Sequence, residues 1–221
     1  MKLESSGILI SLRPFDEANA IAQIFSADFG IMSGMLRGAL SPRRSARPLI
    51  GQIGNFSWNA RLDSALGILH WEPERNLAAP LMQNAQSLAF MNSAFDLISN
   101  LLPEREQYKN LYHDTVKLLN ELASHEKSTE KYLTWEIGFI RDLGYALDLT
   151  HCSGCGRLDN LAYLSPRTGR AVCTDCGAPY ADKLYRLPIT LDTTFRFLEN
   201  ICLNQGAKTP PFRTILKGKF F

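Results

Sequence analysis

Short apolar or alternating runs, separated by turn-forming residues, fill the first 72 positions of the chain. Each run is six or seven residues long and is bounded by proline, glycine or acidic residues, which is typical of β-strands. Five such strands within about seventy residues suit a small closed barrel. The strands are expected at residues 7–12, 20–25, 30–36, 54–60 and 66–71.

From Pro80 onwards, apolar residues recur every three or four positions, which is the period of an α-helix with one buried face. Ser128 is the expected N-cap of one helix. Gly144 and Gly206 are expected to end helices, because glycine readily adopts the left-handed conformation found there. Helices are predicted at residues 80–103, 108–122, 128–144 and 190–204, and no prediction is made after Pro211.

Two Cys-x-x-Cys pairs give the strongest chemical signal. Cys152 and Cys155 are followed, after seventeen intervening residues, by Cys173 and Cys176. A glycine follows each pair and allows backbone N–H groups to approach sulfur, and the spacing suits a four-cysteine zinc site. Zn²⁺ held by four thiolates has no open position for a substrate. The pattern therefore predicts a structural zinc ion, which staples a segment too short to build a core alone.

Two other interpretations of these cysteines stay open: a redox pair, and four cysteines that simply pack. The presence of two pairs disfavours the redox interpretation. Cys202, on the apolar face of the last predicted helix, is interpreted as a small buried residue rather than a nucleophile. His151 directly precedes the first pair and is expected at the surface or behind the metal ligands, because four cysteines already complete the shell.

The loop between the third and fourth predicted strands is rich in arginine and contains no acidic residue. A basic loop with glycine, serine and proline can follow nucleic-acid phosphates, although a solvated surface loop would have the same composition. The candidate phosphate-binding residues are Arg37, Arg43, Arg44 and Arg47.

Aromatic residues on the neighbouring strands allow two interpretations. Phe56, Trp58 and Trp71 could stack on nucleic-acid bases or fill the barrel. Phe56 and Trp58 are two positions apart and so share one face of their strand. This parity favours the barrel interior for that pair.

Composition narrows the class of protein without identifying it. Of 221 residues, 45% are hydrophobic and 21% are charged, which excludes collagen-like, low-complexity and wholly disordered chains. Net charge is +2, yet it is +1 in residues 1–80, −4 in 81–151, zero in 152–182 and +5 in 183–221. A polyanion would therefore meet basic regions on a mixed surface.

Several functional classes are disfavoured by missing patterns. No uncharged apolar run approaches the ~18 residues of a membrane span, and the N-terminus lacks the apolar stretch of a signal peptide. We therefore expect a cytoplasmic protein with no membrane partner. Motifs of serine hydrolases, zinc proteases, dinucleotide-binding proteins and deaminases are missing, so we expect a protein that is not an enzyme.

The chain resembles the RecO family of bacterial recombination mediators across nearly its whole length. The two CxxCG pairs around a YxSPxxG segment are specific, whereas the N-terminal pattern alone would be weak. The resemblance rests on Gly7-Ile-Leu-Ile-Ser-Leu-Arg-Pro14, Glu17-Ala-Asn-Ala-Ile21, Arg37-Gly-Ala39, Cys152-x-x-Cys155-Gly156, Tyr163-Leu-Ser-Pro166 and Ala171-Val-Cys173-x-x-Cys176-Gly177.

The resemblance implies an α+β protein in three parts. These are an N-terminal OB-fold barrel that binds nucleic acid (residues 1–79), a helical bundle (80–150 and 183–221) and an inserted four-cysteine zinc module (151–182). Members of the family bind single- and double-stranded DNA, anneal complementary strands and have no known catalytic activity. They contact the C-terminal tail of single-strand-binding protein and work with RecR to help RecA load, so a nucleoid-associated role is implied.

The sequence therefore predicts a DNA-binding, strand-annealing repair mediator. The cationic C-terminal segment, with its apolar helix face, is expected to contact a protein partner. One alternative is a metal-dependent nucleic-acid enzyme, which would need carboxylate or histidine ligands around an open metal. Another is a zinc-containing adaptor whose barrel binds a protein rather than DNA. DNA binding that weakens with salt would separate these hypotheses.

Overall fold

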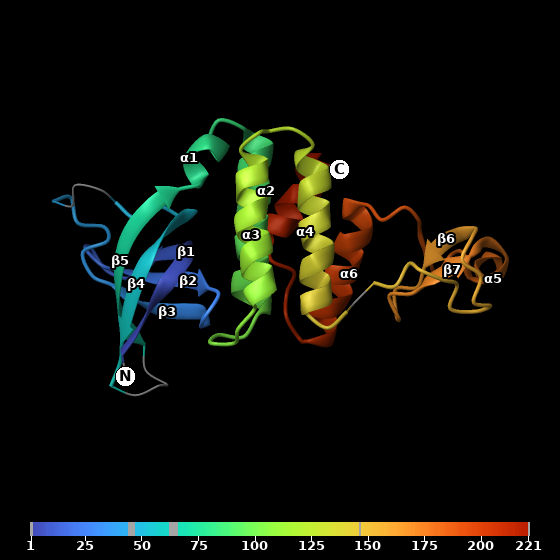
Figure 1. Ribbon diagram of the computed structural model, residues 1–221, viewed down its shortest axis with the longest axis horizontal. Helices are drawn as coiled ribbons and strands as arrows, with labels where there is room; N and C mark the ends of the chain where they lie inside the picture. Colours follow the sequence, from blue (N-terminus) through green and yellow to red (C-terminus); the bar gives the residue numbers. More distant parts are fainter. Residues whose placement is uncertain (1, 44–46, 62–65, 146, 221) are drawn as a thin grey trace. The chain divides into compact units, whose positions relative to one another are not determined.

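The computed structural model describes residues 2–43, 47–61, 66–145 and 147–220. The chain forms two compact units, Met1–Lys131 and Tyr132–Phe221. The first contains a barrel and the helices that follow it, and the second contains further helices and the cysteine-rich segment (Figure 1). The predicted division into three parts remains a prediction.

A closed five-stranded barrel forms the N-terminal part of the first unit. Its strands are β1 (Lys2–Pro14), β2 (Ala20–Ser26), β3 (Gly30–Leu36), β4 (Gln52–Asn59) and β5 (Gly67–Asn76). They pair in the order β1-β2-β3-β5-β4, and β4 pairs with β1 to close the barrel. All neighbours are antiparallel except β3 and β5. The predicted barrel is therefore confirmed, and its topology is that of an OB-fold.

Alternating burial explains why these segments form strands around one core. In β4 every second residue is buried, and Phe56 and Trp58 are 3% and 0% exposed. Trp58 donates its indole N–H to the carbonyl oxygen of Ser33 at 3.0 Å, so burying this ring leaves no unpaired donor. The guanidinium of Arg105 lies over the same ring, 4.7 Å from its centroid.

The first predicted helix is two helices, so that prediction is wrong in part. Helix α1 (Ala78–Leu81) ends, and α2 (Ala85–Leu101) begins after Asn84. The Asn84 side chain accepts hydrogen bonds from the next helix's first N–H groups, those of Gln86 and Ser87, both at 3.0 Å. This N-cap stabilises a new helix start, which the apolar period hides because it runs on through the break.

Helices α3 (Lys109–Leu122) and α4 (Ser128–Asp142) confirm two predicted helices. Ser128 is nevertheless the first helical residue rather than the N-cap, and its hydroxyl lies 3.4 Å from that of Ser87. Lys127, immediately before it, has a φ of 47°. Gly144, with φ of 91°, follows the end of α4 as predicted.

The second unit contains α6 (Leu191–Asn204), α7 (Pro211–Phe220) and a small sheet. Thr190 and Thr193 form a capping box at the start of α6, and Gly206 (φ 66°) follows its end, which confirms the predicted helix. Helix α7 was not predicted from the sequence.

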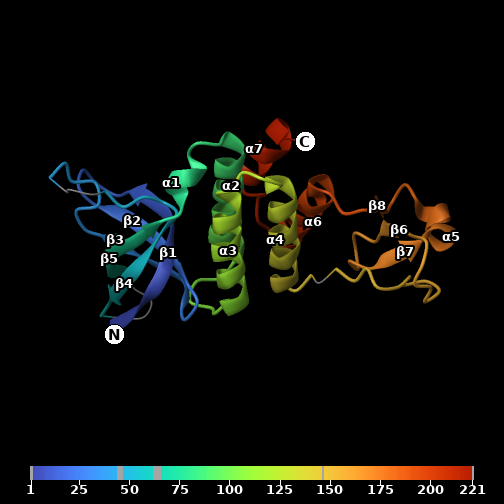
Figure 2. The ribbon, with the colours of Figure 1, turned by 45° about the horizontal axis from the view of Figure 1, so that its top comes forward.

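The cysteine-rich segment folds around a three-stranded sheet in the order β7-β6-β8 (Figure 2). The strands are short: β6 (Leu161–Leu164), β7 (Ala171–Cys173) and β8 (Tyr185–Arg186). Two brief helical turns, α5 (Thr174–Gly177) and η1 (Ala178–Tyr180), follow β7. None of the helices in the described part of the chain has the length and apolar character needed to cross a bilayer.

Candidate metal centre and nucleic-acid interface

The four predicted ligands gather in one place. The Sγ atoms of the four cysteines all lie within 4.8 Å of one another. The first pair lies on the turn before β6, while the second pair spans the end of β7 and the helical turn α5. The paired strands thus bring together two knuckles that are far apart in sequence, and the cluster of Cys152, Cys155, Cys173 and Cys176 is able to hold a metal ion.

The geometry fits a tetrahedral thiolate site. Metal–sulfur bonds of about 2.3 Å in a tetrahedron place sulfur atoms about 3.8 Å apart, and the Sγ atoms of Cys155 and Cys173 are separated by 3.7 Å. The backbone N–H groups of Gly154 and Cys173 donate to Cys152 Sγ at 3.4 and 3.3 Å. Such donors stabilise negative charge on sulfur.

Hydrogen bonds within the cluster give two of its thiols very different pKa values. The backbone N–H of Cys173, followed by those of Cys155 and Gly154, lowers the pKa of Cys152 to about 6, although burial opposes this shift. Hydrogen bonds with the Cys173 and Cys155 side chains raise the pKa of Cys176 to about 12. Without a metal ion, the cluster therefore favours a thiolate at Cys152 and a protonated thiol at Cys176.

Contacts around the cluster hold the two Cys-x-x-Cys pairs in place relative to each other. Arg157, just after the first pair, donates to the carboxylate of Asp175 within the second pair at 2.9 Å. Gly177 lies against Tyr163, and a Cβ at that position would come within 2.3 Å of the ring. The glycine after the second pair is therefore required for packing, whereas Gly156, with φ of 75°, supplies the left-handed turn after the first.

The remaining cysteine and the histidine beside the cluster behave as predicted. Cys202 is 1% exposed, and burial raises the pKa of its thiol, so it is not an activated nucleophile. His151 is partly exposed, and its Nδ1 lies 2.9 Å from the Thr150 hydroxyl rather than in the cluster.

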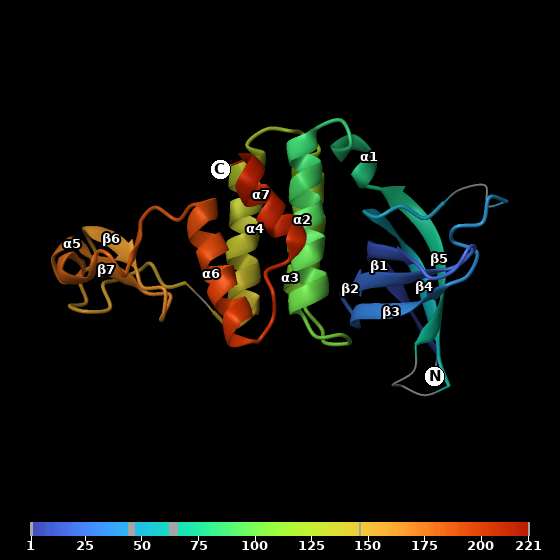
Figure 3. The same ribbon diagram turned by 180° about the vertical axis from the view of Figure 1, so that it is seen from behind.

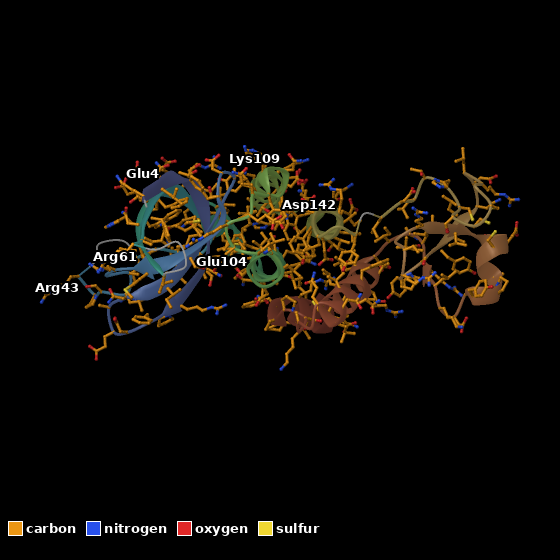
Figure 4. The ribbon with its side chains drawn as sticks, turned by 90° about the horizontal axis from the view of Figure 1, so that it is seen from below. Glu4, Arg43, Arg61, Glu104, Lys109 and Asp142 are labelled. Carbon is orange, nitrogen blue, oxygen red and sulfur yellow. The ribbon has the colours of Figure 1, made fainter. Side chains whose placement is uncertain are left out.

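The arginine-rich loop connects β3 to β4. Arg37, Arg43 and Arg47 are exposed, and Figure 4 shows Arg43 pointing away from the barrel. Arg44 lies outside the described residues. Contact of the four arginines with phosphate stays a prediction, and the exposure of Arg37, Arg43 and Arg47 is what such contact requires.

The aromatic residues on the neighbouring strands fill the barrel. Phe56, Trp58 and Trp71 are 3%, 0% and 4% exposed and belong to one core cluster. The interpretation that they stack on bases is therefore wrong, and the core interpretation is confirmed. Burying a large aromatic side chain is more favourable than leaving it in water, and a closed barrel provides an interior of matching size.

An exposed aromatic residue that the sequence analysis did not single out lies at the β1–β2 turn. Phe15 is 55% exposed, and its signal in the sequence is an Arg-Pro-Phe-Asp-Glu stretch between two strands. Its turn is hydrogen-bonded to the arginine-rich loop, since the backbone N–H of Leu40 donates to the carbonyl oxygen of Ala18 at 2.9 Å.

A buried ion pair in the second unit was also not predicted. Arg213 of α7 and Glu136 of α4 are both fully buried, and the guanidinium donates from Nε to Oε1 at 2.5 Å and from Nη2 to Oε2 at 3.0 Å. The carboxylate also accepts from the hydroxyls of Tyr132 and Thr194. This network fixes α7 against its own unit.

Comparison with known proteins gives a consistent family. Residues 1–73 match the profile described as "Recombination protein O N terminal", and residues 82–215 match "Recombination protein O C terminal". Together these segments cover most of the chain.

Individual relatives agree with the profiles. A protein of Ruegeria sp. (strain TM1040) named "DNA repair protein RecO" is 36% identical over 188 residues, covering 85% of this chain and 78% of the relative. Proteins of the same name from Jannaschia sp. (strain CCS1) and Rhodospirillum centenum (strain ATCC 51521 / SW) are 35% and 39% identical, over 91% and 85% of this chain and 82% and 76% of their own lengths. The two profiles and these relatives show that the chain belongs to the RecO family.

Proposed function

We propose that the protein is a DNA-binding recombination mediator in DNA repair that binds single- and double-stranded DNA and anneals complementary strands. The observation that carries this proposal is a closed OB-type barrel with an exposed arginine-rich loop in a chain of the RecO family. Barrels of this topology bind single strands on the face of strands 2 and 3 and through the β1–β2 and β4–β5 loops, and the arginine-rich loop continues directly from β3. The relatives are named for DNA repair, which supports the same role here.

Phosphate contact is assigned to Arg37, Arg43, Arg44 and Arg47. Guanidinium groups on an exposed loop neutralise phosphates without reading bases, so this contact suits a mediator that acts on any sequence.

A different surface of the barrel carries negatively charged side chains. A cavity of about 660 Å³ between β1, β4 and β5 is lined by Glu4, Asp28 and Glu72 together with His70. Carboxylates repel phosphates. The nucleic acid is therefore expected to avoid this surface and to follow the loop side.

The metal ion at the four cysteines is proposed to be a structural Zn²⁺, one per chain. Four thiolates match the preference of zinc for tetrahedral sulfur coordination. When bound, zinc supplies cross-links between the two knuckles and no catalytic step, which agrees with the proposal that the protein is not an enzyme.

Protein partners are proposed from the family and from the basic C-terminal region. They are RecR and the C-terminal tail of single-strand-binding protein, with RecA loading as the indirect result. Residues 183–221 carry a net charge of +5, and Leu203, Phe212 and Ile215 are exposed on α6 and α7. Such a surface suits an acidic partner with apolar side chains. We further propose a cytoplasmic, nucleoid-associated protein with the three domains 1–79, 80–150 with 183–221, and 151–182.

The deciding experiment measures binding and annealing with labelled oligonucleotides across a salt series, with and without magnesium. We expect affinity to fall linearly on a log–log plot as salt increases, and complementary strands to anneal faster than without protein. Absence of DNA binding at low salt would refute the proposal and favour the adaptor hypothesis. Magnesium-dependent cleavage of the oligonucleotide would favour the enzyme hypothesis.

A further inference from the structure

We propose that Phe15, at the β1–β2 turn, stacks on a base of single-stranded nucleic acid. This inference rests on the proposed DNA-binding function and adds to it a contact that the arginine-rich loop cannot supply. Single strands expose the faces of their bases, and an aromatic ring can stack on any of them.

Phe15 stands apart from the other aromatic residues of the barrel. In the described part of residues 1–76 it is the one phenylalanine, tyrosine or tryptophan side chain that is exposed, at 55%. Phe25, Phe56, Trp58 and Trp71 are buried. Phe29 is partly buried and packs against the barrel core. The barrel therefore offers this one phenyl ring to a ligand.

Strand pairing places Phe15 beside the arginine-rich loop. Pro14 pairs with Ala20, and Ala20 pairs with Leu36. Phe15 and Arg37 are the next residues after Pro14 and Leu36, and β1 and β3 run in the same direction because each is antiparallel to β2. The two residues thus leave the barrel at the same end, two strand spacings or about 10 Å apart.

Hydrogen bonds hold the turn rigidly. The backbone N–H of Phe15 donates to the carbonyl oxygen of Asn19 at 3.0 Å. The Asp16 carboxylate accepts from the backbone N–H groups of Ala18 and Asn19 at 2.9 and 2.8 Å. The Asn19 side chain in turn accepts from the N–H of Gly38 in the arginine-rich loop at 2.9 Å. A preorganised aromatic loses little conformational entropy on binding.

The charges around Phe15 also allow a polyanion to approach. Arg13 and Arg37 are exposed beside the turn, as are Asp16 and Glu17. Hydrogen bonds from the Asn19 side chain and then from the backbone lower the pKa of Asp16, so this carboxylate is charged but already occupied within its own turn. The arginine-rich loop adds Arg43 and Arg47 on the positive side.

The other end of the same β2–β3 surface is covered within the first unit. Phe25 packs edge-on against Tyr112 of α3, with ring centroids 5.8 Å apart. The connection between α2 and α3 bonds to β3, where Arg105 donates its backbone N–H to the carbonyl oxygen of Ile31 at 3.0 Å. The β1–β2 turn and the arginine-rich loop instead leave the barrel on the side away from α2 and α3 (Figures 1 and 3). A single nucleic-acid strand that binds across β2 and β3 can therefore reach the end of this surface where Phe15 lies.

The test compares two ligands with equal numbers of phosphates: an oligo-dT and an abasic oligonucleotide of the same length. Phe15→Leu keeps an apolar side chain and removes the aromatic face. We expect it to weaken oligo-dT binding about 5- to 150-fold, the range for losing one base–aromatic stack, and to leave abasic binding and the salt slope unchanged. Phe15→Trp should restore oligo-dT binding.

Controls separate stacking from structural effects. Tyr180→Leu removes an exposed aromatic (58%) from the cysteine-rich segment and should leave both affinities unchanged. Equal losses of Phe15→Leu on oligo-dT and abasic ligand, or no loss on either, would overturn the stacking role while the DNA-binding function stands. If the unaltered protein does not bind oligo-dT in a salt-dependent way, the proposed function fails and the role of Phe15 fails with it.

Discussion

Trp135 and Phe139 of α4 stack on each other, with ring centroids 5.4 Å apart, and both side chains are buried, at 4% and 0% exposure. Each lies on the apolar face that the sequence predicted for this helix. Replacing either with alanine should destabilise the protein by about 3–5 kcal/mol, the usual cost of truncating a large buried aromatic. Denaturant unfolding measures this change. A variant with unaltered melting and lost DNA binding would contradict the core assignment.

A matched control is Leu203→Ala on α6, where the side chain is 74% exposed. Surface substitutions of this kind usually change the free energy of unfolding by less than about 0.5 kcal/mol. If Leu203→Ala destabilised the protein as much as Trp135→Ala, burial would not be the cause of the effect.

The buried pair of Glu136 and Arg213 gives a second residue-scale prediction. Glu136→Leu removes the carboxylate that neutralises the buried Arg213 guanidinium, which should cost about 3–5 kcal/mol of unfolding free energy. The double variant Glu136→Leu with Arg213→Met removes both charges and should recover much of that loss, because the desolvation penalty disappears with them. A double variant that is less stable than either single variant would show that the pair is net stabilising.

At the scale of elements, the arginine-rich loop is the part whose function can be tested without disturbing the fold. If Arg37, Arg43, Arg44 and Arg47 each neutralise one phosphate of a single strand, counterion release gives a log–log salt slope of about −2.8, or about −0.7 per contact. Changing Arg43 and Arg44 together to alanine should flatten the slope by about 1.4. Because phosphate contacts carry no base identity, oligo-dT and a mixed sequence should weaken alike.

The result that contradicts this assignment is an unaltered slope with unaltered affinity, which would move the DNA site to the basic residues between Lys208 and Lys219. The melting temperature is the control. Arg43 is exposed, and the loop's glycine, serine and proline content is that of a solvated loop, so the double variant should unfold at the same temperature as the unaltered chain.

Helix ends show where periodicity fails as a guide to elements. The apolar period continues from Leu81 to Ala85, yet the Asn84 side chain starts a new helix between them. In α7 the reverse occurs, since a segment with no clear pattern is helical and is held by Arg213 in the core. Local hydrogen bonds and a tertiary ion pair decided these two cases, and neither produces a repeating apolar signal.

At the scale of the whole molecule, metal removal should affect the two units differently. Cys152 and Cys173 share a small buried cluster with Val172 and a few partly buried neighbours, whereas the barrel has its own larger cluster of buried residues. We therefore expect chelation to release a single zinc ion per chain and to raise hydrogen exchange in residues 152–176 before the barrel. Well under one zinc per chain, in protein purified without chelator, would contradict the metal assignment.

The pH dependence of zinc binding follows from the thiols. Metal binding requires thiolates, and the pKa of Cys176 is raised to about 12 by its neighbours when no metal is present. A proton must therefore leave as zinc binds, so affinity should fall as the pH falls. Competition with a chromophoric chelator from pH 8 to pH 5 measures this. A pH-independent affinity would exclude thiolate coordination.

Net charge is distributed unevenly along the whole chain. Residues 81–151 carry −4 and residues 183–221 carry +5, within a total of +2. A near-neutral total conceals basic regions, so the salt dependence of DNA binding is a better probe of this protein than its net charge.

The sequence by itself determined the period-two strands, most of the helices and the four cysteines that form a cluster able to hold a metal ion. These properties follow from local spacing: alternation defines a strand face, and two Cys-x-x-Cys pairs define four ligands whatever the path of the chain between them. The predicted strand β3 matches the structure at both ends. The family resemblance rested on the same local motifs.

Only the tertiary structure decided which side chains face the interior and which elements meet. Trp71 and Phe15 are both aromatic residues of the barrel sequence, yet closure of the barrel buries Trp71, within β5, and leaves Phe15, at the β1–β2 turn, exposed. The placement of Phe15 beside the arginine-rich loop depends on the pairing of three strands. The ion pair of Glu136 and Arg213 joins residues that are 77 positions apart in the sequence. Long-range pairing and burial are set by how the whole chain closes on itself, and local spacing carries no record of them.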